Sequence, residues 1–435
     1  MISDVIILGG GWAGINFATE LKRNFPKLNI TVLEKSSTPG GLLKSEINGG
    51  HTFDIGGSHI IFSRNKFILS RILSKLNGNF VKHARKTYVL LNSMFVPYPL
   101  ENGLYVLPPE ERAEALVYFL EAWFSRENNW TPKNFRDWIY GFFGKWIAEK
   151  YLVPYNLKMW KRPLESIGVD WVYTPGRLPF PDWRSIVKSA IGFPTIGYIE
   201  QNSFYYPKYG GIQSLFNSSV KEAKNLGVRI ISSVKVSELK IQPNNGFIIN
   251  GNIKAKKIIN TIPLIELTKI LEAQSDVTRA SNKLDHNRVL VVGVALKKKA
   301  PNQHWVYVPN KEIIFHRYAW ISNYSLKNAP KNESTLIAET TLIPNTKINI
   351  DELTNKVIKN LEDLNVLSER EILFTKAWVH EYGYPIHKID SRENRERILQ
   401  WLKEKNIVSA GRWGGWRYLN TDKIYEEILT IIKRF

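Results

Sequence analysis

The sequence predicts an α/β protein, α+β overall, with a discontinuous Rossmann-like domain, a helical insertion and an antiparallel β-sheet domain. Three observations predict it: an apolar run that ends in glycines at the start of the chain, an aromatic-rich helical region between residues 108 and 170, and short β-branched and aromatic runs within 88–98 and 289–345. We expect the Rossmann-like domain to comprise residues 1–90, 204–290 and 386–435. The insertion would occupy 108–186, and the sheet domain 91–107, 187–203 and 291–385.

The first element is a strand, a tight turn and a helix. Residues 5–8 are apolar, and apolar residues recur at helical spacing from residue 15 to residue 25. The turn between them matches G-x-G-x-x-G at Gly9, Gly11 and Gly14, and a second strand ends at Glu34, twenty residues later. Such glycines let the backbone approach a pyrophosphate at a helix N-terminus, and the acidic side chain binds the adenosine ribose. This context predicts dinucleotide binding, whereas the glycine pattern alone would not.

Two further glycine pairs follow, and they indicate a long, flat, phosphorylated ligand. They are Gly40 with Gly41 and Gly56 with Gly57. Their spacing resembles that of FAD-binding proteins of the amine oxidase and protoporphyrinogen oxidase type. Later segments, a glycine turn with helix and strand in 206–240 and an apolar strand in 256–263, would return the chain to the first sheet.

The insertion and the third part follow from local signals. "PPEERAEALVYFLEAWF" opens with proline and acids, as a helix N-terminus does, and "TPKNFRDWIYGFFGKW" has a capping residue ahead of an aromatic stripe. Short runs such as "VLVVGVAL" and "STLIAETTL" are typical of strands.

Composition excludes several classes of protein. The 435 residues are 43% hydrophobic and 23% charged, as in an ordinary globular protein. There is no cysteine, which excludes disulfides, thiolate metal sites and a cysteine nucleophile, and we expect no metal. No apolar run reaches the roughly 18 residues that span a bilayer, and Asp4 stands where a secretory signal carries basic residues. We therefore expect a cytoplasmic protein.

The net charge of +20 suggests that the protein could bind anionic partners. Basic residues occur along the whole length with only short clusters, which is also what a solvated lysine-rich surface would give. We expect no specific nucleic-acid binding and favour a phosphate-bearing small molecule. The sequence leaves the oligomeric state open.

Several longer blocks resemble one family in order and in separation. They are "FDIGGSHIIFS", "VPYPLENGLYVLP", "VPYNLKMWKRP", "FHRYAWISNYS", "EYGYP" and "SAGRWGGWRYLN". Together they resemble the UDP-galactopyranose mutases, closer to the eukaryotic branch, within the amine oxidase and protoporphyrinogen oxidase-like FAD superfamily. The resemblance runs from the first strand to about residue 422.

The resemblance implies an isomerase that interconverts UDP-galactopyranose and UDP-galactofuranose. Its cofactor would be FAD, active in the reduced form, which attacks the anomeric carbon and briefly carries the sugar as an adduct while UDP stays bound. NADPH or NADH would be an external reductant. The departing diphosphate then needs fixed cations and hydroxyls, and arginine suits that task because its planar fork donates to two phosphate oxygens at once.

Site residues are carried over from the family block by block. For the diphosphate the resemblance implies Arg177, Arg317, Tyr384, Tyr418 and Asn420. For the uridine and sugar it implies Tyr98, Glu101, Tyr155, Asn156, Trp160, Asn202 and Tyr307. At the flavin it implies His59, Gly411, Arg412 and Val236, and His59, Arg177, Arg317 and Arg412 would be the catalytic residues. Taken singly, each of these arginines and tyrosines would be better interpreted as a surface side chain or a core aromatic.

Two departures from the family stand out. Glu101 occupies the place of a glutamine that contacts uracil, and a carboxylate accepts hydrogen bonds from the base but cannot donate one. Ser58 is an extra residue between the glycine pair and His59, so the geometry of this loop should differ.

Two other functions stay open at this stage. An FAD-dependent oxidoreductase of the amine or protoporphyrinogen oxidase type would share the fold, since fold alone does not fix function. A non-catalytic FAD-bound protein with an anionic partner is the other reading. Arg177 and Arg317 favour the mutase, because an oxidase of apolar substrates has little use for two arginines in its pocket.

Overall fold

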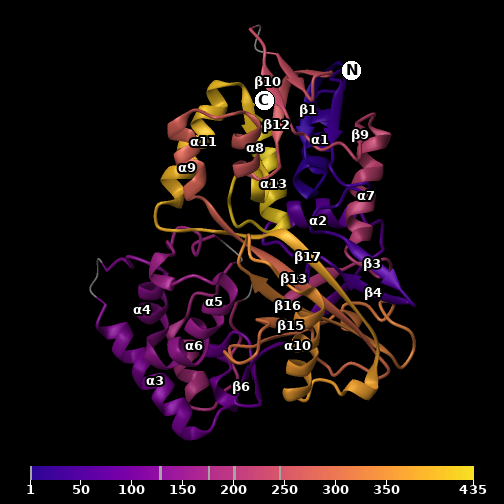
Figure 1. Ribbon diagram of the computed structural model, residues 1–435. Helices are drawn as coiled ribbons and strands as arrows, with labels where there is room; N and C mark the ends of the chain where they lie inside the picture. The colour runs from indigo at the N-terminus through magenta and orange to yellow at the C-terminus, as the bar shows by residue number, and fades with distance from the viewer. Residues whose placement is uncertain (1, 127–129, 175–176, 199–201, 244–245) are drawn as a thin grey trace.

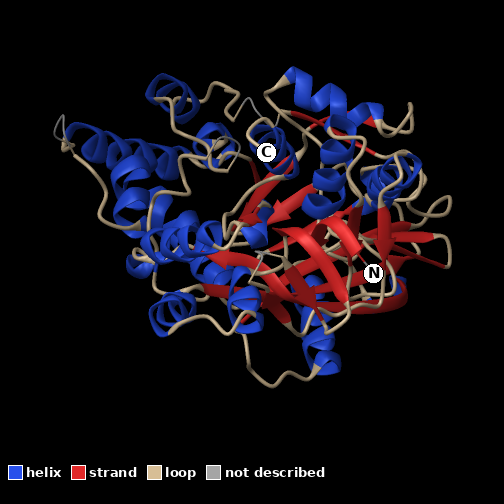
Figure 2. Cartoon of the chain, turned by 90° about the horizontal axis from the view of Figure 1, so that it is seen from above, coloured by secondary structure: helices blue, strands red, loops and turns tan. Residues whose placement is uncertain are grey.

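The computed structural model describes residues 2–126, 130–174, 177–198, 202–243 and 246–435. Figure 1 shows one sheet flanked by helices at the end of the molecule where the N and C labels lie, and a second sheet beyond it with a group of helices at its side. Seen from above, strands occupy the middle and helices the periphery (Figure 2). The mixed α/β fold expected from the sequence is confirmed.

The first sheet is assembled from distant segments of the chain. Its order is β10 (Leu239–Ile241), β11 (Phe247–Ile249), β12 (Ile253–Asn260), β1 (Ile2–Leu8), β2 (Ile30–Leu33) and β9 (Arg229–Ile231), and β18 (Ile407–Ser409) also pairs with β12. The pairs of β1 with β12 and β2, of β2 with β9 and of β12 with β18 are parallel. The strand that carries the glycine turn therefore lies inside the sheet.

Both faces of this sheet are covered by helices, and alternate residues of β1 enter different cores. Val5 and Ile7 pack with α1 (Trp12–Asn24), α7 (Gln213–Asn225) and α13 (Thr421–Ile432). Ile6 and Leu8 pack with α8 (Leu264–Ile270), α9 (Ser275–Lys283) and α11 (Ser391–Glu404). Two buried faces explain why the strand reads as a continuous apolar run.

The second sheet has the order β17 (Ile372–Ile386), β13 (Asp285–Leu296), β16 (Ser334–Leu342), β15 (Arg317–Trp320), β14 (Trp305–Tyr307), β6 (Thr87–Leu91) and β7 (Met94–Pro97). Its pairs are antiparallel except β14 with β6, which is parallel. Helix α10 (Ile350–Asp363) packs on one face through Val357 and Leu361. We expected residues 1–90 to belong to the Rossmann-like domain. Residues 87–90 lie instead in this second sheet, because β6 pairs with β7 across a tight turn.

Smaller elements connect the two sheets. Two hydrogen-bonded strand pairs, β3 (Ser45–Asn48) with β4 (His51–Asp54) and β5 (Val81–Ala84) with β8 (Ser203–Tyr206), lie apart from the large sheets. Helix α2 (Lys66–Ser74) contacts α13.

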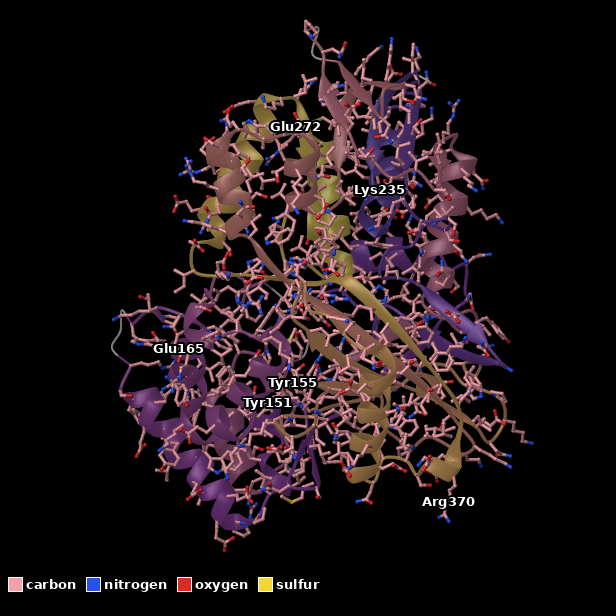
Figure 3. All side chains as sticks on the ribbon, in the orientation of Figure 1. Tyr151, Tyr155, Glu165, Lys235, Glu272 and Arg370 are labelled. Carbon is pink, nitrogen blue, oxygen red and sulfur yellow. The ribbon has the colours of Figure 1, made fainter. Side chains whose placement is uncertain are left out.

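The helical insertion comprises α3 (Pro109–Phe124), α4 (Phe135–Ile147), the π-helical turn η3 (Ala148–Leu152), α5 (Val153–Trp160) and α6 (Trp183–Ala190). Pro109 starts α3, and Asn134 caps α4 by accepting the backbone N–H of Asp137 (2.9 Å). Tyr151 lies in the widened turn of η3 and Tyr155 lies in α5 after it, and their ring centroids are 5.6 Å apart. Figure 3 shows this pair where the insertion meets the second sheet.

Candidate active site

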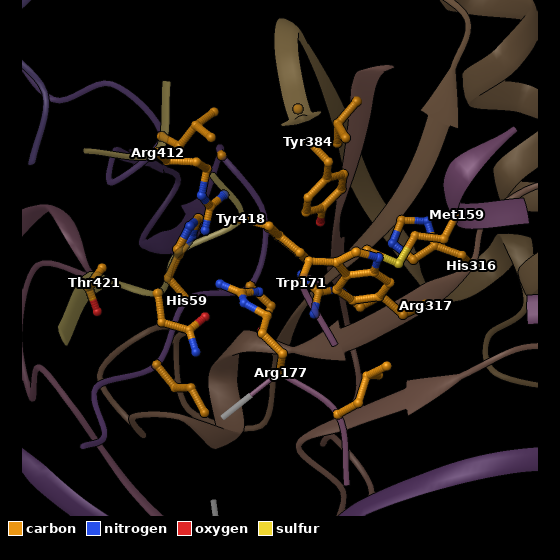
Figure 4. Close-up of a pocket in the computed structure, with 18 of the residues that line it drawn as sticks. His59, Met159, Trp171, Arg177, His316, Arg317, Tyr384, Arg412, Tyr418 and Thr421 are labelled. Carbon is orange, nitrogen blue, oxygen red and sulfur yellow. The ribbon is translucent and has the colours of Figure 1, made fainter. Parts of the chain in front are cut away.

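One cavity of about 300 Å³ runs between the glycine turn, the helical insertion and the second sheet. Residues far apart in the sequence meet in its wall, and Figure 4 shows part of it. The sequence-predicted residues that line it are Gly11, Gly40, Gly41, Gly56, His59, Tyr98, Glu101, Tyr155, Asn156, Trp160, Arg177, Tyr307, Arg317, Tyr384, Arg412, Tyr418 and Asn420.

Seven other predicted residues lie outside this wall: Gly9, Gly14, Glu34, Gly57, Asn202, Val236 and Gly411. The carboxylate of Glu34 accepts the backbone N–H groups of Gly10 and Ser36 (both 2.8 Å), so it holds the glycine turn. Val236 packs against the core that contains α8, α9 and α11. The backbone carbonyl of Asn202 accepts the N–H of Arg85 (2.9 Å). Ligand contacts of these residues stay predictions.

The glycine turn fits a dinucleotide phosphate. Helix α1 begins after Gly11, which makes no side-chain capping bond, so the first N–H groups of the helix lack a side-chain acceptor at the cavity wall. A Cβ on Gly11 would meet nothing closer than the Cα of Gly41, at 3.9 Å. The space beside Gly11 is therefore open, as close approach of a phosphate requires.

Gly14 has a different task, because a Cβ there would lie 1.9 Å from the carbonyl oxygen of Gly9. Gly14→Ala is therefore expected to destabilise the fold by about 3 kcal/mol or more, since backbone must move. Gly11→Ala should leave the free energy of unfolding nearly unchanged and lower the affinity for the dinucleotide. Denaturant unfolding of the two variants, together with the cofactor absorbance of the purified proteins, checks this contrast. Equal stability of both variants would contradict it.

Arg317 forms a buried bidentate ion pair. Its Nε and Nη2 donate to the carboxylate of Glu339 at 2.7 and 2.9 Å, across the register of β15 with β16. Glu339 is 1% exposed and also accepts the backbone N–H of Ser58 (3.0 Å) and the hydroxyl of Tyr384 (3.4 Å). Arg317 holds the pKa of Glu339 below its usual value despite burial, which alone would raise it. The guanidinium keeps further N–H groups beyond those that this pair uses.

Arg177 and Arg412 lie against Tyr418 (Figure 4). The guanidinium carbon of Arg177 is 3.6 Å from the centroid of the Tyr418 ring, and that of Arg412 is 5.3 Å away. Nε and Nη2 of Arg177 are buried with no hydrogen-bond partner in the described part of the chain. Arg412 donates to the carbonyl of Leu419 (3.0 and 2.8 Å). Burial and the nearby Arg177 lower the pKa of Arg412 to about 10.

This arrangement favours an anionic ligand. Arg177, Arg317 and Arg412 all line one cavity, and Glu339 neutralises only Arg317. Buried donors without acceptors are costly, and a ligand with phosphate oxygens would supply acceptors.

His59 lies in the same cavity as a neutral imidazole. Its Nδ1 donates to the carbonyl of Gly57 (2.8 Å), and burial with the charge of Arg412 lowers its pKa to about 4. The extra residue Ser58 is accommodated by two bonds, its N–H to Glu339 and its hydroxyl to that of Tyr324 (2.6 Å). The inserted residue thus ties the loop to the second sheet.

Tyrosines form the far end of the cavity. The ring of Tyr307 lies 4.9 Å from that of Tyr98 and 5.3 Å from that of Tyr155. Asn156 uses both ends of its amide within the protein, donating to Leu152 (2.8 Å) and accepting from the indole of Trp160 (3.1 Å). Asn156 therefore orients Trp160. The aromatic end fits a flat ring such as a nucleobase.

Sequence reasoning missed several residues of the site. Glu339 is the main omission, although a single acid within the apolar strand "STLIAETTL" is a usable signal for a buried ion pair. Residues of the cavity wall that it also missed include Tyr151, Trp171, Tyr198 and His316. Among the described residues, no group of three or more His, Asp or Glu side chains is placed to hold a metal ion.

The chain is similar to known dinucleotide-binding proteins in sequence and in fold. Residues 7–76 match the NAD(P)-binding Rossmann-like domain. A putative protoporphyrinogen oxidase from Exiguobacterium sp. 255-15 superposes with a TM-score of 0.75 at 15% identity, covering 99% of this chain and 98% of that one. The chain has a flavoenzyme-like fold with a dinucleotide-binding domain.

A more similar structure is that of reduced UDP-galactopyranose mutase, with a TM-score of 0.90 at 23% identity over 99% of this chain and 95% of that one. At this identity the likeness shows the fold alone. The chloroplastic prolycopene isomerase of Arabidopsis thaliana is 24% identical over 277 residues, 58% of this chain and 44% of that protein's length. In the described parts of the chain, every helix is too short or too polar to cross a membrane.

Proposed function

We propose that the protein is a flavin-dependent nucleotide-sugar mutase that interconverts UDP-galactopyranose and UDP-galactofuranose. The observation that carries this proposal is the convergence of Arg177, Arg317 and Arg412 on a cavity that starts at a dinucleotide-binding turn and ends among tyrosines. A nucleoside diphosphate sugar has two phosphates for the cations and a base for the aromatic rings. The fold shared with a UDP-galactopyranose mutase supports the proposal.

The proposed cofactor is FAD. Its pyrophosphate would lie at the N-terminus of α1, along Gly11, Gly40 and Gly41, and its ring near His59 and Arg412. When bound and reduced, FAD supplies the nucleophile for displacement at the anomeric carbon. Arg412 provides positive charge beside the ring, and neutral His59 offers a hydrogen-bonding imidazole without a second charge.

The remaining residues would hold UDP while its bond to the sugar is broken. Arg177 donates from its two unpartnered nitrogens, and Arg317 is fixed in direction by Glu339. A fixed leaving group returns to the same sugar, because the reaction stays within one binding event. Tyr384 and Tyr418 place hydroxyls beside these cations, and their rings are 5.5 Å apart.

The test is product analysis of dithionite-reduced protein incubated with UDP-galactofuranose. We expect UDP-galactopyranose to form without consumption of reductant, and NADPH or NADH to replace dithionite. The matched control is the oxidised protein, which should give no product. Absence of turnover in the reduced protein would contradict the proposal, and oxygen consumption with an amine would instead assign the oxidase function that the fold also supports.

A further inference from the structure

The carboxyl group of Glu101 is buried in the cavity wall without a counter-ion. Glu101 lies in the short 3-10 turn η1 (Leu100–Asn102) that follows β7, and it is 3% exposed. Its Oε1 has no hydrogen-bond partner among the described residues, and no described lysine, arginine or histidine forms an ion pair with it. A buried polar atom without a partner calls for an explanation, and a ligand group in the cavity that Glu101 lines is one.

Arg85 is the charged side chain that acts on Glu101, without forming an ion pair with it. Its Nη1 is buried with no hydrogen-bond partner among the described residues. Its Nη2 donates to the carbonyl of Tyr98 (3.1 Å), and its guanidinium lies over the rings of Tyr98 and Tyr198 at 5.1 and 5.5 Å from their centroids. These stacking contacts hold the cation beside the aromatic rings.

Other ionisable groups near η1 do not neutralise the carboxyl. Tyr98, Tyr151, Tyr198 and Tyr307 line the same cavity with neutral hydroxyls. The two helices packed against η1 carry their basic side chains on exposed positions: Arg136 and Lys145 on α4, and Arg184 and Lys188 on α6. The carboxylate of Asp137 on α4 accepts a hydrogen bond from the backbone N–H of Lys133. Tyr105 belongs to the neighbouring turn η2 (Leu104–Val106). Burial therefore outweighs both the backbone N–H of Glu101, which hydrogen-bonds the carboxyl group, and the charge of Arg85, and it raises the pKa of Glu101 to about 7.

The two protonation states of this carboxyl recognise different bases. A carboxylic acid has one donor and one acceptor, so it can accept the imide N–H of uracil and donate to the neighbouring carbonyl, as a glutamine amide does. A carboxylate only accepts, so it repels the uracil carbonyls and suits the adjacent N–H and NH₂ donors of guanine. The base that binds best therefore depends on which form is present.

We propose that Glu101 binds the imide edge of uracil as a carboxylic acid, so that the affinity for UDP-sugars is coupled to uptake of one proton. This inference rests on the proposed function and specifies how its nucleotide is selected. Affinity is then full at pH values below the pKa of Glu101 and falls as pH rises through it.

The test is calorimetric titration of the oxidised holoprotein with UDP-galactose from about pH 5.5 to about pH 8.5, a range in which a sugar diphosphate keeps its charge. We expect the affinity to be constant on the acid side and to fall about tenfold per pH unit above the pKa. Glu101→Gln should bind UDP-galactose with an affinity that is independent of pH, because its amide always donates. Glu114→Gln, which changes an exposed carboxyl on α3, should keep the pH dependence of the unmodified protein.

Three results would overturn the inference while leaving the proposed function standing. The first is a pH-independent affinity of the unmodified protein for UDP-galactose, and the second is the same pH dependence in Glu101→Gln. The third is tighter binding of GDP-mannose than of UDP-galactose at the acid end, where the carboxylic acid should favour uracil. Failure of UDP-galactose to bind at every pH, in both proteins, would overturn the proposed function as well.

Discussion

Arg317→Ala is expected to lower the free energy of unfolding by about 3–5 kcal/mol and also to weaken UDP binding. The reason is the environment of Glu339, which is 1% exposed and paired with Arg317 at 2.7 and 2.9 Å. Without the guanidinium, a buried carboxylate would keep only the N–H of Ser58 and the hydroxyl of Tyr384. Denaturant unfolding measures the loss of stability. Titration with UDP, under conditions in which the variant is still folded, measures the loss of affinity.

A second substitution separates the two effects of Arg317. Adding Glu339→Gln to Arg317→Ala removes the buried charge and should restore most of the stability, but it should not restore UDP affinity. The exposed pair of Arg136 with Glu165, 49% and 54% exposed, is the matched control, and Arg136→Ala should cost no more than about 1 kcal/mol. An Arg317→Ala protein of unchanged stability would show that the Glu339 pair is not needed by the fold.

Arg177→Ala should weaken UDP binding by about 2–5 kcal/mol, as Arg317→Ala does, but it should leave the free energy of unfolding unchanged. Nε and Nη2 of Arg177 have no hydrogen-bond partner in the described protein, so truncation breaks no ion pair like that of Arg317 with Glu339. It also removes a cation near Arg412, whose pKa burial and Arg177 together lower to about 10. Stability should therefore stay constant or rise slightly.

Thermal unfolding with and without UDP measures both the stability of the Arg177→Ala protein and its stabilisation by UDP. The unmodified protein should be stabilised by UDP, and the Arg177→Ala protein much less so. Arg177→Lys keeps the charge but loses the planar fork and the contact with Tyr418, so it should recover only part of the affinity. Full stabilisation of Arg177→Ala by UDP would remove Arg177 from the site.

The N-terminal part of the fold could be predicted because its signals are local. The turn with Gly9, Gly11 and Gly14, the strand before it and the helix after it lie within one short segment, and β1 and α1 form there. Glu34 could also be placed at the end of β2, but its bonds to Gly10 and Ser36 depend on how the turn folds back.

The electrostatics of the site could not be predicted in the same way. The pairing of Arg317 with Glu339 depends on the register of β15 with β16, which no local pattern gives. The contact of Arg177 with Tyr418 joins residues 241 positions apart, 177 and 418, through the packing of three parts of the molecule. Family resemblance named both arginines, but only the three-dimensional arrangement distinguishes the paired cation from the unpartnered one.

The way in which the first sheet is assembled also has a consequence for biosynthesis. β1 needs β12 as a neighbour, β12 needs β18, and the cavity wall extends from Gly11 to Ile424. A nascent chain on the ribosome therefore cannot complete the ligand pocket until residue 424 has emerged. In the helical insertion, α3 packs against α4 and α4 against η3, so these contacts join neighbouring segments of the chain and can form before the rest of the pocket has been synthesised.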